Sequence, residues 1–540
     1  MLKLNIVHPC GADQHSSQVP AGRNNRELVH VAIGHIGHKP KSGTSKKLEL
    51  LTGRLQIRSN HLSTSKVIST VHNMATSTPP AQTFTADINI PPSPVPVHLS
   101  RKPHIPPEIL SSIFTLCLPD DWEDCGVRAR AIPVLLSQVS VYWRSVAVST
   151  PLLWSSMHIR LEKDISDRTM DMFETWLART HGTLLSIMVE DFSSVDEEQT
   201  VTHPTLELIL SCCHRWQHFA FDLPILLARS LSAVKDKLPC LESLSAHCRS
   251  SWPEQLNPLQ NTFQNAPRLT SLDLGPYPTF PDLAVPWTQL TKLKTDMDLD
   301  DMIVILHHSP NLVHLCVSPN SQDPGATRPL VKLPHVATLV IDTNEDPANL
   351  FDCLVVPHLH NLNIFLYGFE PEDDGREWWG WPEPLISLIF RSSCSIQSFT
   401  FGTRAIDFDA DDLTRCLQAM PTLRDLTLQL RDHWSNLIED ILYHLIRRRA
   451  KSCIIPKLMY LDLSLLVPRQ YKTLIDMIES RWRIVDHDGG GTLDMARLQV
   501  VILRGIFSKR DLDMLAPLRK LKDEGMKISF LDSWNNPVTF

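Results

Sequence analysis

The sequence predicts an α/β protein in three parts: a disordered N-terminal region, a small three-helix unit, and an irregular α/β solenoid of repeated helix–turn–strand units. Three observations predict this organisation. Residues 1–100 show no sustained helical or strand period, residues 104–157 contain three short amphipathic segments, and an apolar triplet recurs from about residue 165 onward. We therefore place the parts at residues 1–100, 101–160 and 165–540.

The N-terminal region is rich in Ser, Thr, Asn, His and Pro and ends in the proline-rich stretch INIPPSPVPVHL. Such a segment cannot bury enough apolar surface to offset chain entropy, so we expect disorder. Met74 is an alternative start of translation. Residues 1–100 carry ten Lys and Arg against four Asp and Glu (+6), which leaves 42 against 56 (−14) for the remainder. An acidic body without a basic stripe argues against nucleic-acid binding.

Composition and targeting signals indicate a soluble cytoplasmic or nuclear protein. Apolar residues make up 43% of the 540 residues, and no apolar run approaches the ~18–20 residues of a membrane span. The N-terminus lacks the apolar core of a secretory signal. The twelve cysteines include no C-x-x-C pair, so we expect reduced thiols and no metal site.

Residues 104–157 begin at Pro106 and Pro107, whose missing N–H groups suit a helix start. Apolar residues then mark three helical faces. The first face consists of Ile109, Leu110, Ile113, Phe114 and Cys117, the second of Leu135, Leu136 and Val139, and the third of Trp143, Val146 and Ala147. Leu153 and Trp154 close the unit. A fifty-residue unit this apolar needs a partner surface.

Three linked motifs make this stretch resemble an F-box. Ile105-Pro106-Pro107-Glu108-Ile109-Leu110 matches the L-P-x-E-[I/L]-L opening, Leu136 to Arg144 matches L-x-x-V-x-x-x-W-R, and Pro151-Leu152-Leu153-Trp154 matches P-x-L-W. Ile105 replaces the usual Leu, and Pro119–Arg130 lengthens the first link, as in the F-box-like variant of mushroom-forming fungi.

The resemblance implies docking to the Skp-type adaptor of a cullin–RING ubiquitin ligase. The contact residues it implies are Pro106, Pro107, Ile109, Leu110, Ile113, Phe114, Leu136 and Val139. Trp143, Leu153 and Trp154 are expected in the core of the unit. The alternative is a three-helix core that only caps the next domain.

The repeated array is recognised by apolar residues at positions 0, +3 and +5. The triplets begin at Leu184, Trp216, Leu241, Leu269, Leu312, Val336, Leu359, Ile396, Leu423, Leu458 and Leu498, and a weaker unit, Leu290-Leu293, breaks at Thr295. Proline stands two residues before the first position in seven of these twelve units, where its average content would give about one. The pattern resembles an irregular leucine-rich-repeat solenoid, with parallel strands on one face and helices on the other. The alternative is an α/β domain of another topology.

Other motifs carry weaker signals. Trp378, Trp379 and Trp381 either anchor a target protein or pack under the next helix. Asp486–Asp494 half-resembles a calcium loop, but Arg497 stands where a chelating carboxylate is required, which favours a simple turn. Arg447-Arg448-Arg449 suits a helix C-terminus and is a weak nuclear-import signal.

We expect no enzyme: no catalytic signature is present, and the sequence assigns no catalytic, cofactor-binding or metal-binding residue. The favoured hypothesis is a substrate-recognition subunit of a ligase, which docks to the adaptor and presents an unidentified target on the array. The alternatives are a repeat scaffold capped by the helical unit and a hydrolase or transferase with an unrecognised site.

Overall fold

The computed structural model describes fifteen segments of the chain. They are residues 105–119, 125–127, 131–161, 166–191, 203–248, 259–275, 283–320, 328–367, 380–403, 410–430, 435–446, 454–464, 467–483, 495–532 and 536–538. The predictions for residues 1–100, Met74, the 447–449 run and the 486–494 segment lie outside these ranges. The chain divides into two units, one of Met1–Ser156 with Thr175–His181 and one of Met157–Glu174 with Gly182–Phe540.

The first unit contains three short helices where the apolar faces predict them. They are α4 (Pro107–Leu116), α5 (Ile132–Ser137) and α6 (Val141–Val148), followed by the 3₁₀ turn η2 (Pro151–Leu153). Pro107 takes the first helical position of α4, where its missing N–H costs nothing. The Ser140 side chain caps α6 by accepting a hydrogen bond from the Trp143 N–H at 3.1 Å.

Aromatic residues form the core of the first unit. The rings of Phe114 and Trp143 lie 4.9 Å apart. Trp154 is fully buried, and its Nε1 donates to the Ala147 carbonyl at 2.9 Å. The last turn of α7 (Asp167–Arg179) completes this core, because Trp176 Nε1 donates to the Trp154 carbonyl at 3.0 Å. Each buried indole N–H is therefore paired.

The second unit is built on one long sheet. Its described residues contribute fourteen strands that lie in chain order, and the pairings from β2 to β16 are parallel. The strands are β1 (Ser156–Arg160), β2 (Leu185–Glu190), β3 (Trp216–Leu223), β4 (Ser243–Cys248), β5 (Ser271–Leu274), β6 (Lys292–Asp298), β7 (His314–Asn320), β9 (Thr338–Thr343), β11 (Asn361–Leu366), β12 (Ser398–Thr403), β13 (Asp425–Gln429), β14 (Tyr460–Ser464), β15 (Val500–Arg504) and β16 (Lys527–Leu531). β8 (Val331–Lys332) and β10 (Leu354–Val355) form a separate parallel pair.

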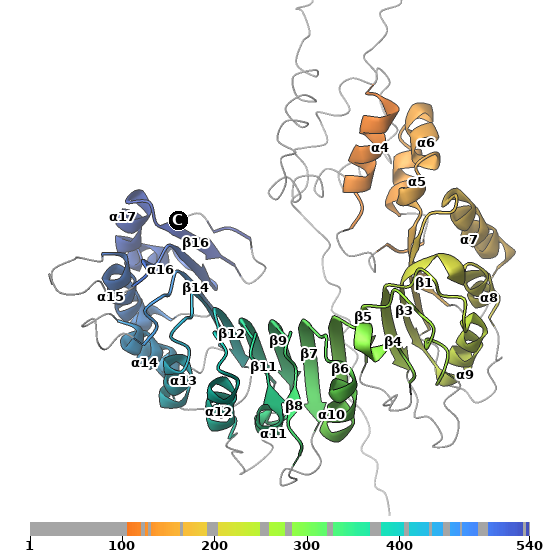
Figure 1. Ribbon diagram of the computed structural model, residues 1–540. Helices are drawn as coiled ribbons and strands as arrows, with labels where there is room; N and C mark the ends of the chain where they lie inside the picture. Colours follow the sequence, from red (N-terminus) through yellow and green to blue (C-terminus); the bar gives the residue numbers. More distant parts are fainter. Residues whose placement is uncertain are drawn as a thin grey trace, which may run out of the picture. The chain divides into compact units, whose positions relative to one another are not determined.

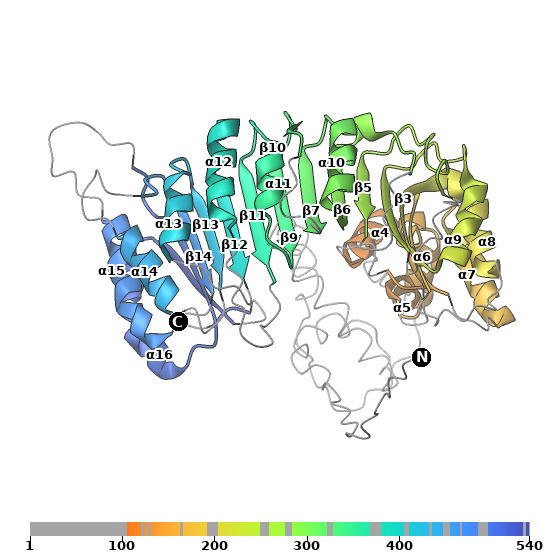
Figure 2. The same ribbon diagram turned by 90° about the horizontal axis from the view of Figure 1, so that it is seen from below.

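Helices connect these strands and lie along one face of the sheet (Figures 1 and 2). They are α8 (Pro204–Ser211), α9 (Ile225–Ala228), α10 (Leu299–His308), α11 (Ala348–Cys353), α12 (Pro382–Ser392), α13 (Ala410–Gln418), α14 (Ser435–Leu445), α15 (Tyr471–Trp482), α16 (Lys509–Met514) and α17 (Pro517–Asp523), with 3₁₀ turns η3 (Cys213–Arg215), η4 (Arg229–Val234), η5 (Trp287–Gln289) and η8 (Pro468–Gln470). The second unit is thus an α/β repeat solenoid, which agrees with the predicted fold class.

The apolar triplets form continuous rows across the sheet. The second positions of successive units are Cα partners, as in Leu272–Leu293–Leu315, and so are the third positions. Thr295, where the weak unit breaks, still occupies the core row and is buried. The first unit of the array needs a correction, because a register shift at the start of β2 buries Leu185 and leaves Leu184 exposed.

The recurring prolines begin tight turns before the strands. In the turn before β13, the Leu423 N–H donates to the Met420 carbonyl at 3.1 Å across Pro421. The fixed φ of proline suits this second turn position. Backbone hydrogen bonds of 2.8–3.0 Å also join the start of each strand to its neighbour, in a ladder from Glu242 to Gln499. Prolines therefore begin the turns before seven of the strands, and the backbone ladder joins strands with and without one.

Candidate protein-interaction surfaces

The first unit carries an exposed apolar stripe on α4. Ile109, Ile113 and Leu116 lie at helical spacing beside the buried stripe of Leu110 and Phe114. The Ile109 side chain is 46% exposed, and Ile113 and Leu116 are half-buried. A large apolar side chain that is nearly half exposed is characteristic of a contact surface when other exposed apolar side chains surround it.

Two elements that are hydrogen-bonded to α4 or to the residues before it also carry exposed apolar residues. Val141 is 80% exposed and Leu152 is 58% exposed. The Tyr142 hydroxyl, next to Val141, donates to the Ile105 carbonyl at 2.5 Å, which brings the start of α6 to the start of α4. Thr150, two residues before Leu152, shares a 3.0 Å hydrogen bond with a serine of α4. These bonds tie the elements that carry Val141 and Leu152 to α4.

The structure separates the expected adaptor contacts into two groups. Pro106, Pro107 and Ile109 are exposed, and Ile113 and Val139 are half-buried. Leu110, Phe114 and Leu136 are buried in the core of the unit, so they support the surface and do not form it. Of the expected core residues, Leu153 and Trp154 are buried and Trp143 is half-buried against Phe114.

The expected tryptophan contact requires a correction at Trp381. This side chain is 0% exposed and its ring lies 5.4 Å from that of Phe401. It precedes Pro382 at the start of α12 and packs against the sheet, which is the packing alternative named above. Trp378 and Trp379 lie outside the described residues.

The sheet of the second unit has an open face opposite the helices. Residues between the core rows alternate with the core residues, and most of them are half-buried or exposed. Carboxylates on this face include Glu190, Asp222, Asp273, Asp296 and Asp342, and also Asp425 and Asp462. Nearby cations offset part of this charge: His158 Nε2 lies 2.8 Å from Glu190, and Lys294 Nζ lies 3.2 Å from Asp273.

One polar cluster on the open face includes Ser245, His247 and Asp273. The Ser245 hydroxyl lies 3.4 Å from His247 Nε2, and Asp273 Oδ1 lies 3.6 Å from that same nitrogen. A catalytic Ser–His–Asp triad needs its serine and its carboxylate on opposite ring nitrogens. The cluster therefore lacks triad geometry. The His247 ring packs against Gly275, where an added Cβ would lie 2.5 Å from the ring.

Charge and burial perturb two carboxyls of this face in opposite directions. Burial opposes ionisation of Asp273, but His247 and Lys294 outweigh it and hold the pKa of this carboxyl below its usual value. For Asp296, burial raises the pKa, a hydrogen bond from Asn320 lowers it, and the charge of Asp342 raises it; the pKa lies above its usual value. Neighbouring cations thus outweigh the cost of burying the charge at Asp273, whereas the neighbours of Asp296 do not.

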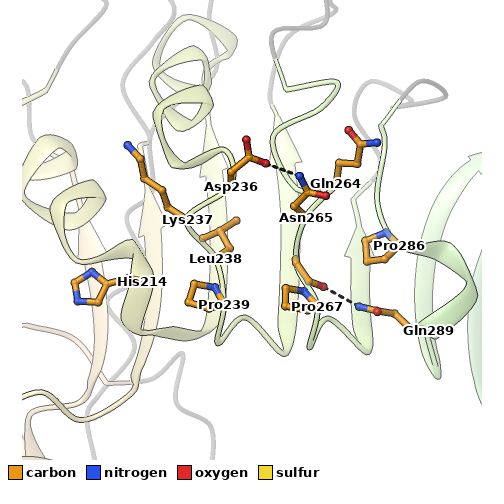
Figure 3. A pocket seen from close by; sticks show the side chains of 11 residues that line it. His214, Asp236, Lys237, Leu238, Pro239, Gln264, Asn265, Pro267, Pro286 and Gln289 are labelled. Atoms are coloured by element: carbon orange, nitrogen blue, oxygen red, sulfur yellow. Dashed lines mark hydrogen bonds between the residues drawn. The ribbon is translucent and has the colours of Figure 1, made fainter.

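A cavity of about 700 Å³ lies at the turns before β4, β5 and β6 (Figure 3). Its lining consists of His214, Asp236, Lys237, Leu238, Pro239, Gln264, Asn265, Ala266, Pro267, Pro286 and Gln289. Asn265 Nδ2 donates to Asp236 Oδ1 at 2.5 Å, and Gln289 Nε2 donates to the Ala266 carbonyl at 2.7 Å. These bonds join neighbouring turns, so much of the polar lining serves the fold.

The cysteines in the described ranges are buried or half-buried. Burial raises the pKa of the Cys248 and Cys416 thiols to about 12, and the cysteines in the described ranges are not joined in disulfides. Within those ranges no three His, Cys, Asp or Glu side chains gather as metal ligands would. The helices described there are too short or too polar to cross a bilayer.

No protein-family model matches the chain, and no curated protein matches it. A crystal structure of a protein from Bacteroides fragilis is similar at 14% sequence identity and a TM-score of 0.30, over 58% of this chain and 74% of that one. At that TM-score the likeness carries no argument. The class of protein, an α/β repeat solenoid joined to a small helical unit, rests on the strand order and register.

Proposed function

We propose that the chain is a substrate-recognition subunit of a cullin–RING ubiquitin ligase. In this proposal the first unit is an F-box-like domain that binds a Skp-type adaptor, and the second is a leucine-rich-repeat-like array whose open face binds a target protein. The chain then acts in the cytoplasm or nucleus by holding the target near a ubiquitin-charged enzyme supplied by the complex. It needs no bond-making residue of its own.

The observation that carries the proposal is the exposed α4 stripe. Ile109 remains 46% exposed, although the unit has a complete core of its own beneath it. Val141 and Leu152 are still more exposed. Exposed apolar side chains on a small folded unit are what a helix-binding partner covers. The open, charged face of the sheet supports the second half of the proposal.

Co-purification with the adaptor tests the proposal. Ile109→Asp with Ile113→Asp should abolish adaptor binding and leave the array folded, because two charges would be desolvated in the interface. The matched control is Val304→Asp with Phe390→Asp, which places two charges at exposed apolar positions of α10 and α12. The proposal fails if the unchanged chain does not bind the adaptor, or if both double variants bind it equally well.

A second candidate is a repeat scaffold in which the helical unit serves as an N-terminal cap. The observation that favours it is that α7 supplies its last turn to the core of the first unit, where Trp176 packs edge-on against Trp154 at 4.8 Å and the Arg179 guanidinium lies 4.4 Å from the Trp154 ring. Trp154→Phe distinguishes the two functions. If the unit is a cap, this substitution should lower the stability of the array, and the chain should bind no adaptor with or without it. If the unit is a docking domain, the substitution should weaken adaptor binding and leave the stability of the array unchanged.

A further inference from the structure

The cavity at the turns before β4, β5 and β6 is lined by three prolines, which we call the proline shelf (Figure 3). Pro239 and Pro267 stand two residues before the first triplet position of neighbouring units, whose strands β4 and β5 are paired, and Pro286 lies in the turn before β6. Pro239 and Pro267 are exposed, and Pro286 is half-buried. Leu238 and Ala266, which also line the cavity, are buried in the core. The shelf is therefore an apolar surface that is open to solvent and fixed to the core beneath it.

Some of the polar side chains around the proline shelf are not used by the fold. His214 and Gln264 are exposed, and neither makes a hydrogen bond or an ion pair within the part of the chain that the structure describes. Lys237 Nζ donates to the Ala233 carbonyl at 2.9 Å and has no carboxylate partner there. Burial raises the pKa of the Cys213 thiol and the charge of Lys237 lowers it, which places this ammonium near η3. One cation and two polar groups therefore remain for a ligand.

The turns around the cavity are positively charged, although the chain as a whole is acidic. The segments that precede β3, β4, β5 and β6 are residues 213–215, 235–242, 264–270 and 284–291. They carry four Lys or Arg against two Asp or Glu (+2), whereas the whole chain carries −8. Lys235, Lys237 and Arg268 are exposed, and none of them pairs with a carboxylate in the described ranges. The cavity thus lies in a locally positive region of the surface.

Both carboxylates of these turns already accept hydrogen bonds. Asp236 Oδ1 accepts from Asn265 Nδ2 at 2.5 Å, and Glu242 Oε2 accepts from Gln217 Nε2 at 2.9 Å. Of the two, Asp236 lines the cavity and Glu242 does not. A ligand that approaches the proline shelf therefore meets more cations than carboxylates, and charge complementarity favours an anionic ligand.

We propose that the proline shelf binds a short acidic peptide segment of a partner protein, in which a proline and an aromatic ring lie between two carboxylates. Neighbouring turns are spaced like their strands, at about 4.8 Å, so the turns from β3 to β6 span about 14 Å. An extended peptide advances about 3.3 Å per residue, so four or five residues cover this length. The Gln264 amide offers a donor and an acceptor to the peptide backbone.

The rings of the ligand supply most of its affinity. Exposed ion pairs contribute little, and salt screens them, so the cations of the turns select the sign of the ligand more than they hold it. An aromatic ring that covers the shelf removes a large apolar area from water. This site lies at the turns of the array and not on its open face, and its test does not involve the adaptor.

Binding of model peptides to the full-length chain tests the proposal. The acidic probe is acetyl-Glu-Pro-Trp-Glu-amide, its neutral counterpart is acetyl-Gln-Pro-Trp-Gln-amide, and each titration is followed on the NMR signals of the peptide. Two exposed ion pairs should make the acidic peptide bind about 2- to 30-fold more tightly, and the difference should shrink as salt is added. Replacing the tryptophan of the acidic probe with alanine should weaken binding, because the shelf is then left uncovered. The proposal fails if the neutral peptide binds as tightly as the acidic one, or if the alanine peptide does.

Charge reversal at the turn before β4 locates the site. Lys235→Glu with Lys237→Glu should abolish the preference for the acidic peptide and create one for acetyl-Lys-Pro-Trp-Lys-amide, because the sign of the local charge is inverted. The matched control is Lys509→Glu with Lys520→Glu, which makes the same change in net charge at exposed positions of α16 and α17. This control should bind the acidic peptide like the unchanged chain. Circular dichroism confirms that both variants are folded, and equal binding of the acidic peptide by the two folded variants overturns the proposal.

Discussion

Replacing Thr295 with valine should stabilise the array. Thr295 occupies the third position of the apolar triplet, between Leu274 and Val317 in adjacent strands, and is 1% exposed. Its Oγ1 has no hydrogen-bond partner within the described ranges. A buried hydroxyl without a partner costs about 1–3 kcal/mol, and valine has nearly the same shape. We expect Thr295→Val to gain stability in that range.

Urea unfolding measures the overall gain, and hydrogen exchange of the β6 amides locates it. If the gain appears in the local opening free energy, those amides should exchange about 5- to 150-fold more slowly. Thr400→Val is the matched control, because Thr400 lies on the open face of β12 and is half-buried. A Thr295→Val chain that is less stable than the unchanged one would refute the reasoning, since it would show that the hydroxyl is satisfied in solution.

Three further predictions concern the open face and the turns. Gly275→Ala should cost about 1–2 kcal/mol in urea unfolding, because its Cβ would lie 2.5 Å from the His247 ring, and His247→Ala in the same chain should recover most of it. The pKa of Asp273 lies below its unfolded value, so its contribution to stability is present above about pH 3.9 and is lost as the pH falls through the folded pKa. Lys294→Met should therefore shift acid unfolding, followed by circular dichroism, to higher pH; an unchanged transition contradicts the assigned cause. Pro421→Ala should lower the urea midpoint by an amount equivalent to about 0.4–1 kcal/mol, since it frees the unfolded chain, and a variant of equal stability would show that the turn gains nothing from proline.

The array was predictable because its signal is repeated. A single apolar triplet means little, but the spacing together with the prolines identifies most strands of the sheet. β16 was missed because its first triplet position is Gly525, at φ +103°, and Met526 supplies the buried side chain instead. β1 was missed because its two core residues fall within the range assigned to the helical unit.

The candidate surfaces were less predictable from sequence. Ile109 and Leu110 are neighbours of equal hydrophobicity, yet one is 46% exposed and the other is in the core. Both belong to apolar stripes at helical spacing, and periodicity does not say which stripe the unit buries. The burial of Trp381 likewise depends on a residue distant in sequence, because its ring packs against that of Phe401 in β12 at 5.4 Å. The cluster of Ser245, His247 and Asp273 could have been found in the sequence, because polar residues alternate with the apolar triplet positions there and must share the open face.

The ladder of backbone bonds between successive turns has a mechanical consequence. Each strand of the array is hydrogen-bonded to the strands before and after it in the sequence. A force that pulls on the C-terminus therefore loads only the last remaining strand at any moment. The array should peel from that end in small steps of similar force, each releasing a helix and its strand. A β-sandwich, whose strands are sheared together, would instead rupture in one event at much higher load.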